Sequence, residues 1–406
     1  MRLKDVASVN LRSLDESTKG DYAFKYIDIS SVSFENGIEL GEDIIYSQAP
    51  SRARRIVKKG DVLVSTVRTY LRAIADIDWD AENVIASTGF AVYTPNDNIS
   101  PRFLAYAVKS TNVINQICSN SKGISYPAIQ ASALSAVEIP YFGKVKQEAI
   151  AAYLDKECEK IGREIELLER KADAYRRLRR SLINHAVTRG LNPNASLKPS
   201  GIPWIVSIPA HWDIKRGKPL FQEIYRDVRP EDGTVTCFRN GEVTLRTNRR
   251  TTGFTESEKE IGYHGVRVGD LVIHQMDAFA GSIGISDSDG KCSPICIVCR
   301  PLHEDEADLG YYCQLLRVMA HSGFIQSLAK GIRERTTDFR YKTLVTLRFP
   351  VPPYNEQQQI AAYLDEKCGK IDAIIEKIGS KVERLKELKR SLINEVVTGK
   401  RAIKNI

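Results

Sequence analysis

Cysteine, histidine and carboxylate side chains are the groups through which this 406-residue chain could hold a metal or catalyse a reaction. Cys292, Cys296 and Cys299 form the pattern C-x3-C-x2-C, which radical iron–sulfur enzymes use, and His303 and Cys313 are near enough in sequence to contribute to a zinc site. The segment KCSPICIVCRP, however, has the composition of a strand, on which residues three apart point to opposite faces. We therefore predict that these cysteines fill a hydrophobic core, with a metal site as the alternative.

Other motifs that suggest catalysis are incomplete. The segment VPPY at residues 351–354 resembles the Asp/Asn-Pro-Pro-Tyr loop of amino-methyltransferases, but valine cannot accept a hydrogen bond from a target amine, and no glycine-rich turn for a nucleoside cofactor is nearby. The acidic strings at 256–259 and 365–367 lack a second carboxylate at a strand end, and the chain has no P-loop. No pair among the six histidines has metal-ligand spacing on a helix: His185, His211, His264, His274, His303 and His321. The sequence predicts no catalytic residue and no bound metal.

Composition indicates a folded chain with more than one domain. Of its residues, 42% are hydrophobic and 27% are charged, and the length allows two or more cores. The first residues show no basic-then-apolar pattern before a small-residue cleavage site, and no apolar run reaches the roughly 18 residues of a membrane span, so we expect a cytoplasmic location. The eight cysteines are then expected to remain thiols. The net charge of +8 mildly favours a polyanionic partner.

A duplicated segment organises the chain. Residues 150–188 align with residues 360–398 without a gap, with 20 identities in 39 positions and the shared hexapeptide IAAYLD. The preceding regions match faintly: KKGDVLVSTVRTYLRAIA from Lys58 resembles RVGDLVIHQMDAFAGSIG from Arg267, and KGI recurs at Lys122 and Lys330. The chain therefore consists of two half-repeats, each a strand-rich globular region followed by one long helix.

Hydrophobic residues recur with a heptad period in both copies. The seam consists of Leu154, Ile161, Leu168, Tyr175 and Leu182 in the first copy and Leu364, Ile371, Ile378, Leu385 and Leu392 in the second, with Cys158, Ile165, Ala172, Cys368, Ile375 and Val382 between them. No proline interrupts either copy, so each predicts a continuous helix of about 39 residues, on the order of 58 Å long. We expect the two stripes to bury each other within one chain. The alternative is that each packs on its own globular region or on another subunit.

The predicted fold class is α+β, with two strand-rich domains and two long helices. The first domain spans residues 1–140 and its helix 141–190. A linker at 191–202 lies within RGLNPNASLKPSGIP, whose Gly, Pro, Asn and Ser residues end a helix. The second domain spans 203–350 and its helix 351–406.

Polar residues at matched positions of the two globular regions differ in kind. After the matched pairs Gly60–Asp61 and Gly269–Asp270, Ser65 aligns with His274, Thr66 with Gln275, Arg68 with Asp277, and Arg72 with Gly281. Two copies of one enzyme would be expected to repeat their chemical residues. A shared scaffold with different polar side chains instead suits readers of two different DNA targets, since each base pair offers its own donors and acceptors. The alternative is two diverged domains with ordinary solvated loops.

Three longer motifs carry a family resemblance. PPYNEQQQIAAYLD at 352–365, ELKRSLINEVVTGK at 387–400 and GIPWIVSIPAHWDIKRGKPLF at 201–221 resemble the specificity subunit of type I restriction–modification systems, and the similarity covers nearly the whole chain. Two places depart from the family pattern. RLKDV near Met1 lacks the tryptophan-containing lead of residues 208–212, and PYFGKVKQEAIAAYLD lacks the second proline and the Glu-Gln pair. The local contacts at these places are therefore left open.

The resemblance implies a non-enzymatic, sequence-specific DNA-binding subunit active in phage defence. It would bind two adenine-methylating modification subunits to make a DNA methyltransferase, and restriction subunits to make an ATP-driven nuclease. S-adenosylmethionine, ATP and Mg would belong to those partners, with no cofactor on this chain. Each target-recognition domain would read one half of a split DNA sequence, and the different polar side chains predict an asymmetric, bipartite target.

The resemblance also sets the direction of the helices. Two domains that face inverted half-sites on one duplex require an antiparallel pair of helices, related by a pseudo-two-fold axis. Cys158 and Cys368 would then be roughly 33 Å apart at the helical rise. A parallel pair would place these two cysteines within disulfide range.

We expect base reading from the loop after the Gly–Asp strand and from the loop around KGI. The candidates are Arg68, Tyr70, Arg72, Lys122, Ser125 and Tyr126 in the first domain, and His274, Gln275, Asp277, Arg333, Arg335 and Arg340 in the second. The alternative for each is phosphate contact or solvation. The basic stretches 52–59 and 246–250 fit phosphate contact or solvation better than base reading. Residues 176–180 could contact DNA or a modification subunit, or simply place positive charge near a helix C-terminus.

Two other functions remain as alternatives. A stand-alone DNA methyltransferase or nuclease is disfavoured by the missing cofactor loop and by the unmatched chemical residues. A protein-only coiled-coil adaptor predicts no DNA binding even with modification subunits present.

Overall fold

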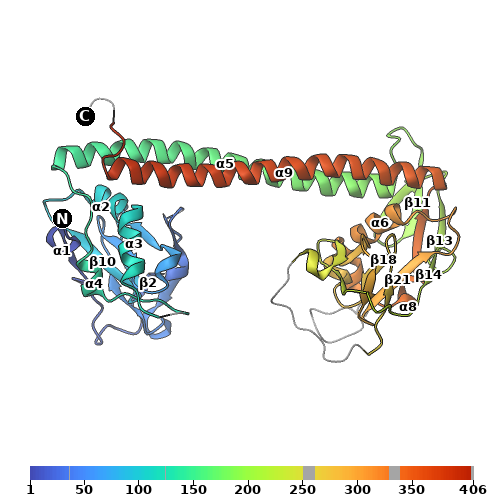
Figure 1. The fold of residues 1–406 in the computed structure, drawn as a ribbon, viewed down its shortest axis with the longest axis horizontal. Coiled ribbons are helices and arrows are strands. Elements are labelled where there is room, and N and C mark those ends of the chain that lie inside the picture. Colours follow the sequence, from blue (N-terminus) through green and yellow to red (C-terminus); the bar gives the residue numbers. More distant parts are fainter. Residues whose placement is uncertain (36, 124, 250–260, 329–338, 404–406) are drawn as a thin grey trace. The chain divides into compact units, whose positions relative to one another are not determined.

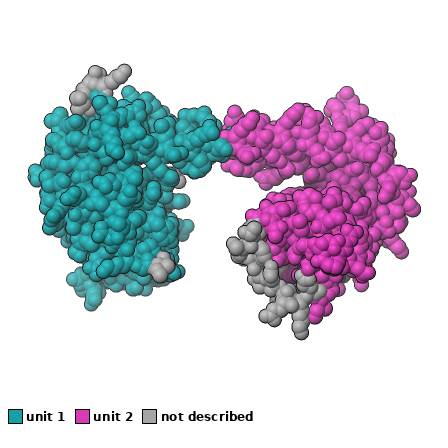
Figure 2. Space-filling model, viewed as in Figure 1, with its two compact units in different colours: residues 1–170, 378–406 teal, residues 171–377 magenta. Residues whose placement is uncertain are grey.

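The computed structural model of the chain describes residues 1–403 except 36, 124, 250–260 and 329–338 (Figure 1). The chain divides into two compact units: unit 1 is Met1–Arg170 with Ile378–Ile406, and unit 2 is Lys171–Lys377 (Figure 2). Two long helices, α5 (Lys144–Arg189) and α9 (Tyr354–Val397), each contribute to both units. Within the described part of the chain, every helix is too short or too polar to cross a membrane.

Unit 1 contains two four-stranded sheets. The first, in the order β1-β10-β7-β8, is antiparallel and comprises β1 (Ala7–Val9), β10 (Phe90–Pro95), β7 (Val62–Ser65) and β8 (Ile74–Asp76). The second, in the order β5-β2-β9-β6, comprises β5 (Asp43–Ile45), β2 (Ala23–Ile27), β9 (Val84–Ser87) and β6 (Ala53–Ile56), with β2 and β9 parallel. The remaining elements are the β3–β4 hairpin (Val32–Ser33, Gly37–Ile38), the helices α1 (Leu3–Val6), α2 (Pro101–Val108), α3 (Thr111–Ser119) and α4 (Ala131–Ser135), and the 3₁₀ turns η1 (Ile29–Ser31), η2 (Tyr46–Gln48) and η3 (Thr69–Leu71).

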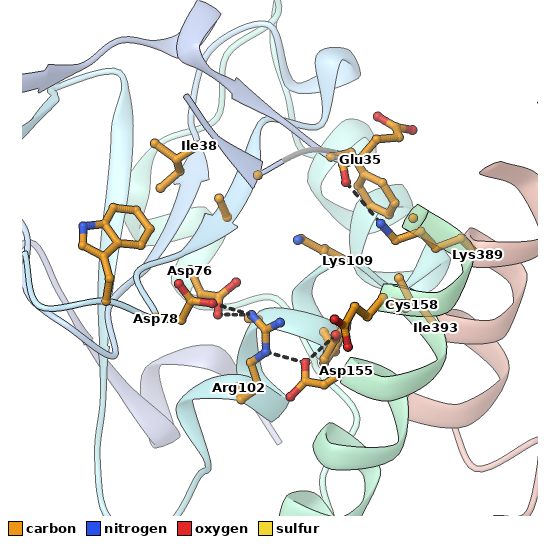
Figure 3. A pocket seen from close by; sticks show the side chains of 18 of the residues that line it. Glu35, Ile38, Asp76, Asp78, Arg102, Lys109, Asp155, Cys158, Lys389 and Ile393 are labelled. Atoms are coloured by element: carbon orange, nitrogen blue, oxygen red, sulfur yellow. Dashed lines mark hydrogen bonds and ion pairs between the residues drawn. The ribbon is translucent and has the colours of Figure 1, made fainter. Parts of the chain in front are cut away.

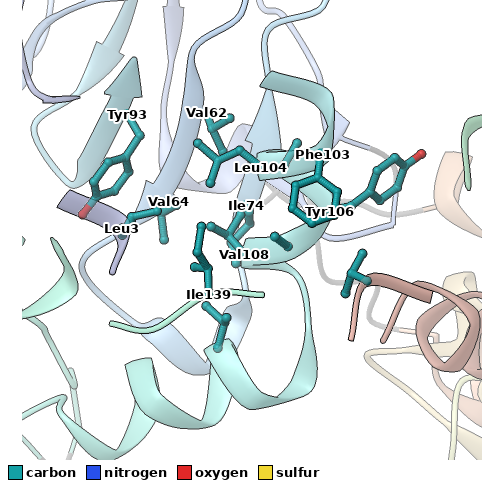
Figure 4. Close-up of a cluster of buried hydrophobic side chains, with 14 of the residues drawn as sticks. Leu3, Val62, Val64, Ile74, Tyr93, Phe103, Leu104, Tyr106, Val108 and Ile139 are labelled. Atoms are coloured by element: carbon teal, nitrogen blue, oxygen red, sulfur yellow. The ribbon is translucent and has the colours of Figure 1, made fainter. Parts of the chain in front are cut away.

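Strand β7 is buried on both faces, which explains why its sequence VLVS is a continuous apolar run. Val62 and Val64 join Tyr93 and residues of helices α2 and α3 in one core (Figure 4). Leu63 belongs to a second core, which includes Phe90. The end of β7 is therefore held rigidly from both sides.

Unit 2 is built around a sheet in the order β14-β21-β18-β19, which comprises β14 (Phe221–Glu223), β21 (Cys296–Pro301), β18 (Leu271–His274) and β19 (Ile283–Ile285). Its other strands pair as β11 (Leu197–Ile202) with β12 (Ile205–Pro209), β13 (Asp213–Arg216) with β22 (Arg348–Val351), β15 (Val235–Cys237) with β16 (Val243–Leu245), and β17 (His264–Val266) with β20 (Gly290–Cys292). Its shorter helices are α6 (Leu309–His321), α7 (Phe324–Ser327), α8 (Tyr341–Leu344), η4 (Arg246–Asn248) and η5 (Ala278–Ala280). Strand β11 occupies the second half of the predicted linker.

The antiparallel sheet of unit 2 repeats the sheet order of unit 1, because β14, β21, β18 and β19 stand in the places of β1, β10, β7 and β8. The matched Gly–Asp pairs begin the inner strands. Gly60 and Gly269 have φ of 90° and 85°, the left-handed conformation that their turns require. Asp61 and Asp270 are buried, and each accepts a backbone hydrogen bond at 2.8 Å from the residue three positions before it. The faint sequence match therefore reflects a shared scaffold.

The long helices pack against each other through buried residues of both. In unit 1, Leu154 and Cys158 of α5 share a core with Leu392 and Val396 of α9. In unit 2, the last turns of α5 share a core with the first turns of α9, through Ile183, Ala186, Val187, Ile360, Leu364 and Cys368. Each unit thus pairs the start of one helix with the end of the other, so the predicted antiparallel coiled coil is confirmed.

Ion pairs across the two helices support the same direction. Glu164 pairs with Lys381 at 2.7 Å in unit 1, and Arg179 pairs with Asp372 at 2.9 Å in unit 2. The helices contain 46 and 44 residues, longer than the predicted 39, because each begins several residues before the duplicated segment.

A buried glutamine fixes the first turn of each long helix to its globular domain. Gln147 donates to the carbonyl oxygens of Asn98 and Phe142, and its Oε1 accepts from the backbone N–H of Ser100 at 2.8 Å. Gln357 makes the equivalent contacts with Glu306, Pro352 and Asp308. The first helix lacks the glutamate of the Glu-Gln pair but retains this glutamine, so the contact that the sequence left open is present in both halves.

Cys292, Cys296 and Cys299 are buried in cores, as predicted. Cys296 and Cys299, both on β21, belong to different clusters on opposite sides of the sheet. Cys292 lies on β20 beside His264, with Sγ 3.4 Å from Nε2. Burial raises the pKa of the Cys299 thiol. Among the residues that the structure describes, no group of three His, Cys, Asp or Glu side chains is arranged to hold a metal.

Candidate nucleic-acid interface

In unit 1, the structure brings the two predicted loops together. The β7–β8 loop (residues 66–73) pairs with the α3–α4 loop (residues 120–130) through a bridge from Val67 to Ala128, and a second bridge, from Lys122 to Ala128, closes the α3–α4 loop on itself. Arg68 N–H donates to the carbonyl oxygen of Pro127 at 2.7 Å, and Thr66 oxygen accepts from Ile129 N–H at 2.8 Å. The backbone therefore presents both loops as one surface at the end of β7.

The turn η3 at the tip of the β7–β8 loop has an unusual backbone. Arg68 and Arg72, which flank η3, have φ of 49° and 53°, a left-handed conformation uncommon for residues other than glycine. Thr69, the first residue of η3, is buried, and its Oγ1 lies 2.9 Å from Ser121 Oγ in the α3–α4 loop. This hydrogen bond ties the turn to the neighbouring loop.

The six candidates of the first domain are all exposed: Arg68, Tyr70, Arg72, Lys122, Ser125 and Tyr126. The Arg68 guanidinium lies over the Tyr126 ring, 5.0 Å from its centroid, so the two loops also meet through side chains. Guanidinium, ammonium and hydroxyl groups on one surface can donate hydrogen bonds to phosphate oxygens and to the acceptors on base edges.

Unit 2 repeats this backbone arrangement. Gln275 occupies the place of Thr66: its N–H donates to Ile295 oxygen, and its carbonyl oxygen accepts from Phe339 N–H at 3.2 Å. Arg340, which follows Phe339, precedes α8 and is exposed. The structure therefore places His274, Gln275 and Asp277 beside the segment that contains Arg340. The candidates Arg333 and Arg335 lie outside the described residues.

His274 is half-buried at the end of β18. Its Nδ1 accepts a hydrogen bond from Asp277 N–H at 3.1 Å, which leaves Nε2 to carry the hydrogen of the neutral ring. Burial lowers the pKa of His274, while the nearby Asp277 carboxylate acts in the opposite direction. At neutral pH, His274 is therefore a neutral donor through Nε2.

Asp277 does not stand alone as an acceptor. Its Oδ1 lies 2.9 Å from Arg239, whose side chain is mostly exposed. Arg239 was missed in the sequence because it reaches Asp277 from 38 residues upstream, a contact that no local pattern predicts. The second surface therefore presents a guanidinium held by a carboxylate, whereas the first presents a guanidinium held against an aromatic ring.

The basic stretches are partly occupied by internal contacts. Arg54 lies over the Tyr46 ring at 5.0 Å. Arg249 pairs with Glu242 at 2.7 Å and lies over the Phe238 ring. In residues 176–180, Arg176 pairs with Asp173 and Arg179 with Asp372. Lys59 pairs with Asp80 at 3.1 Å, whereas Arg52 and Lys58 are exposed.

A pocket of about 520 Å³ lies in unit 1 between the β3–β4 hairpin and the long helices (Figure 3). Arg102 at its wall bonds Asp76 at 2.5 Å and Asp155 at 2.6 Å, which ties α2 to α5. Glu35 bonds Arg390 and Lys389. Lys109 points into the pocket, where burial lowers its pKa. The charged side chains on the wall largely form ion pairs and hydrogen bonds with one another. These contacts connect the globular domain of unit 1 to the long helices.

Comparisons with known proteins agree with this architecture. Residues 1–170 match the family model described as the type I restriction modification DNA specificity domain. The chain is 30% identical over 104 residues to the type I restriction enzyme HindI specificity subunit of Haemophilus influenzae, a match that covers 25% of this chain and 23% of that protein. It is 22% identical over 431 residues to a protein of Methanocaldococcus jannaschii assigned as the type I restriction enzyme MjaX specificity subunit, over 99% of this chain and 93% of that protein.

Two solved structures share the fold. One, from work on complex assembly and conformational transition of the type I R-M system, is 22% identical, with a TM-score of 0.71 over 99% of this chain and 97% of that chain. The other, the HsdS subunit from Thermoanaerobacter tengcongensis, is 23% identical, with a TM-score of 0.50 over 99% of this chain and 96% of that chain.

Proposed function

We propose that this chain, which resembles the specificity subunits of type I restriction–modification systems, is such a subunit and that its two surfaces read the two halves of an asymmetric, bipartite DNA sequence. The observation that carries the proposal is the common backbone of the two surfaces combined with their different side chains. Thr66 and Gln275 make the same backbone contacts. The side chains above them differ: the first surface has Arg68 stacked on Tyr126, and the second has Arg239 paired with Asp277. Identical frames with different donors suit two different half-sites.

The chain acts in this proposal as a non-catalytic component. It binds two modification subunits, which methylate adenine, and restriction subunits, which cleave DNA. S-adenosylmethionine, ATP and Mg are bound by those partners. The two long helices run antiparallel in unit 1 and in unit 2. This antiparallel direction supports the proposal that the two domains read their half-sites in opposite directions along the duplex.

Methylation mapping tests the proposal. A host that carries this chain with its cognate modification subunit should gain adenine methylation at one split motif, and a host with the modification subunit alone should not. Exchange of residues 1–140 for the first domain of a relative should change one half of the motif only, and exchange of residues 203–350 should change the other half.

Two results would contradict the proposal. Methylation at the same motif without this chain would place sequence reading in the modification subunit. A verified, assembled complex that neither methylates nor binds DNA would leave the chain as an adaptor between proteins.

Within each surface, single substitutions separate base reading from phosphate contact. Arg68→Ala should relax the motif at one position if Arg68 reads a base, since one bidentate base contact is worth about 1–3 kcal/mol of discrimination. If Arg68 contacts phosphate, the substitution weakens binding to all sequences alike and reduces the salt dependence of binding. Ser17→Ala, at an exposed position of the same unit, serves as the control.

A further inference from the structure

The tip of the β7–β8 loop exposes two large apolar side chains. Tyr70, the middle residue of the turn η3, is 55% exposed, and Leu71, its last residue, is 49% exposed. About half of each side chain is therefore open to solvent. Two neighbouring apolar side chains exposed at one loop tip form a small contiguous patch, the kind of surface that suits a binding partner.

The frame that holds this tip is strained and is specific to the first domain. Arg68 and Arg72 adopt left-handed backbone conformations on either side of Tyr70 and Leu71. In the second domain, Asp277 aligns with Arg68 and has a φ of −106°, outside the left-handed region. Gly281 aligns with Arg72 and has a φ of 90°, a conformation that glycine adopts without strain. The chain therefore keeps arginines at strained positions where its own second copy has an unstrained backbone.

The matched residues of the second domain do not form an exposed tip. Phe279 and Ala280 stand in the places of Tyr70 and Leu71, and both are half-buried. Phe279 packs against the core of unit 2. The exposed tip therefore distinguishes the two domains and does not follow from the common fold.

The surroundings of the tip identify its partner by charge. Arg68 and Arg72 flank it, and Lys122 lies on the adjoining loop, so the apolar side chains are surrounded by cations. A stacked base step has the complementary arrangement, with flat apolar surfaces inside and a phosphate on each side. Proteins that kink DNA insert apolar side chains between base pairs in this way and unstack them.

We propose that Tyr70 and Leu71 form a wedge that enters the duplex at one base step of the half-site read by the first domain, while Arg68 and Arg72 bind the flanking phosphates. This inference rests on the proposed DNA-reading function. Thr69, buried and hydrogen-bonded to Ser121, keeps the turn from collapsing when the wedge meets the bases. The second domain reads its half-site without such a wedge, so the two halves of the target differ in deformation as well as in sequence.

The experiment uses the assembled complex of this chain with its modification subunits. Duplexes carry 2-aminopurine at successive positions of the first half-site, and both affinity and fluorescence are measured. Unstacking predicts a several-fold rise in fluorescence at one step on binding. The double variant Tyr70→Ala with Leu71→Ala should abolish that rise and weaken binding to the intact duplex about tenfold. Val206→Ala, which alters a side chain 89% exposed in unit 2, is the control and should change neither.

A duplex that is already unstacked separates a wedge from an ordinary contact. With a mismatch or an abasic site at the responsive step, the double variant should recover most of its lost affinity, because the unstacking free energy no longer has to be supplied. Equal loss of affinity on intact and mismatched duplexes, or no fluorescence change at any position despite tight binding, overturns the wedge. Failure of the double variant to assemble with modification subunits would assign the tip to a protein contact instead. A complex with no DNA affinity at all defeats the proposed function itself.

Discussion

At Arg72 the chain holds a long side chain in a backbone conformation for which glycine is the usual residue. The matched position in the second domain is Gly281, where a Cβ atom would lie 2.8 Å from His321 Cε1. Both positions have a left-handed backbone, but they differ in the space available for a side chain. One accepts a side chain at a conformational cost, and the other has no room for it.

Replacement of Arg72 by glycine should therefore stabilise the protein and impair its function. We expect the free energy of unfolding to rise by about 0.5–1 kcal/mol, since the left-handed strain is removed and only part of the gain is lost to the flexibility of the unfolded chain. Urea denaturation measures this change, and DNA affinity of the assembled complex should fall. The reciprocal test is Gly281→Ala, which should destabilise. An Arg72→Gly variant that loses stability would show that the arginine makes structural contacts that outweigh its strain.

Among the secondary-structure elements, each long helix is fixed to its globular domain by a buried glutamine. Gln147 and Gln357 make equivalent buried hydrogen bonds, and each accepts from the N-cap residue of a domain helix, Ser100 or Asp308. The glutamine therefore sets the angle at which the helix leaves the domain. A loop that must meet a base within about an ångström depends on this fixed connection.

Gln357→Ala should lower the free energy of unfolding by about 2 kcal/mol, because it leaves a buried backbone N–H and two carbonyl groups without their partner. Hydrogen exchange should accelerate first in the opening turns of α9. Gln358→Ala, at the exposed neighbouring position, is the matched control and should change little. Equal effects of the two substitutions would mean that the buried hydrogen bonds do not fix the helix.

Cysteine crosslinking tests the direction of the helices. Cys158 lies in the core of unit 1 and Cys368 in the core of unit 2, as the antiparallel arrangement requires. Mild oxidation should therefore form no disulfide between them, as judged by mass spectrometry of the digested protein. The engineered pair Glu164→Cys with Lys381→Cys, which replaces an ion pair of 2.7 Å across the helices, should crosslink within one chain. A Cys158–Cys368 disulfide formed without denaturation would indicate a parallel pair.

Sequence reasoning was most effective for the helices and weaker for the sheets. Heptad spacing and the exact repeat of IAAYLD predicted the helices and their seam, because helix packing depends on local periodicity. The strands have only two to six residues and pair over long distances, so their order could not be read from the chain. At the site, the two loops were predicted separately, and their contact through Val67, Arg68 and Thr66 became visible only in the structure. Leu71 and Arg239 were missed because exposure and the approach of a distant segment leave no local signal.

On the scale of the whole molecule, titratable groups are unevenly distributed. All six histidines fall within residues 171–377, which form unit 2. Burial lowers the pKa of His264, His274 and His321 below their usual 6.5. The unfolded chain therefore takes up protons at a higher pH than the folded chain does.

Unit 2 should accordingly lose stability as the pH falls below about 6.5, because protonation then favours the unfolded state. We expect its free energy of unfolding to decrease between pH 7.5 and 5.5, by an amount that the partial exposure of these rings limits. Hydrogen exchange resolved by segment should show faster opening in unit 2, with unit 1 unchanged. Equal acceleration in both units would point to a cause other than histidine.

Each unit is completed by a segment that belongs, in chain order, to the opposite half. Leu392, Ile393, Val396 and Val397 fill the core that also contains Leu154 and Cys158. During synthesis, the first domain therefore waits for residues 378–397, which leave the ribosome after the whole second domain. Until then the nascent chain exposes the apolar stripe of α5, and a chain truncated before residue 378 has a first domain that lacks part of its core. The core of the first domain can therefore be completed only after the second domain has been made.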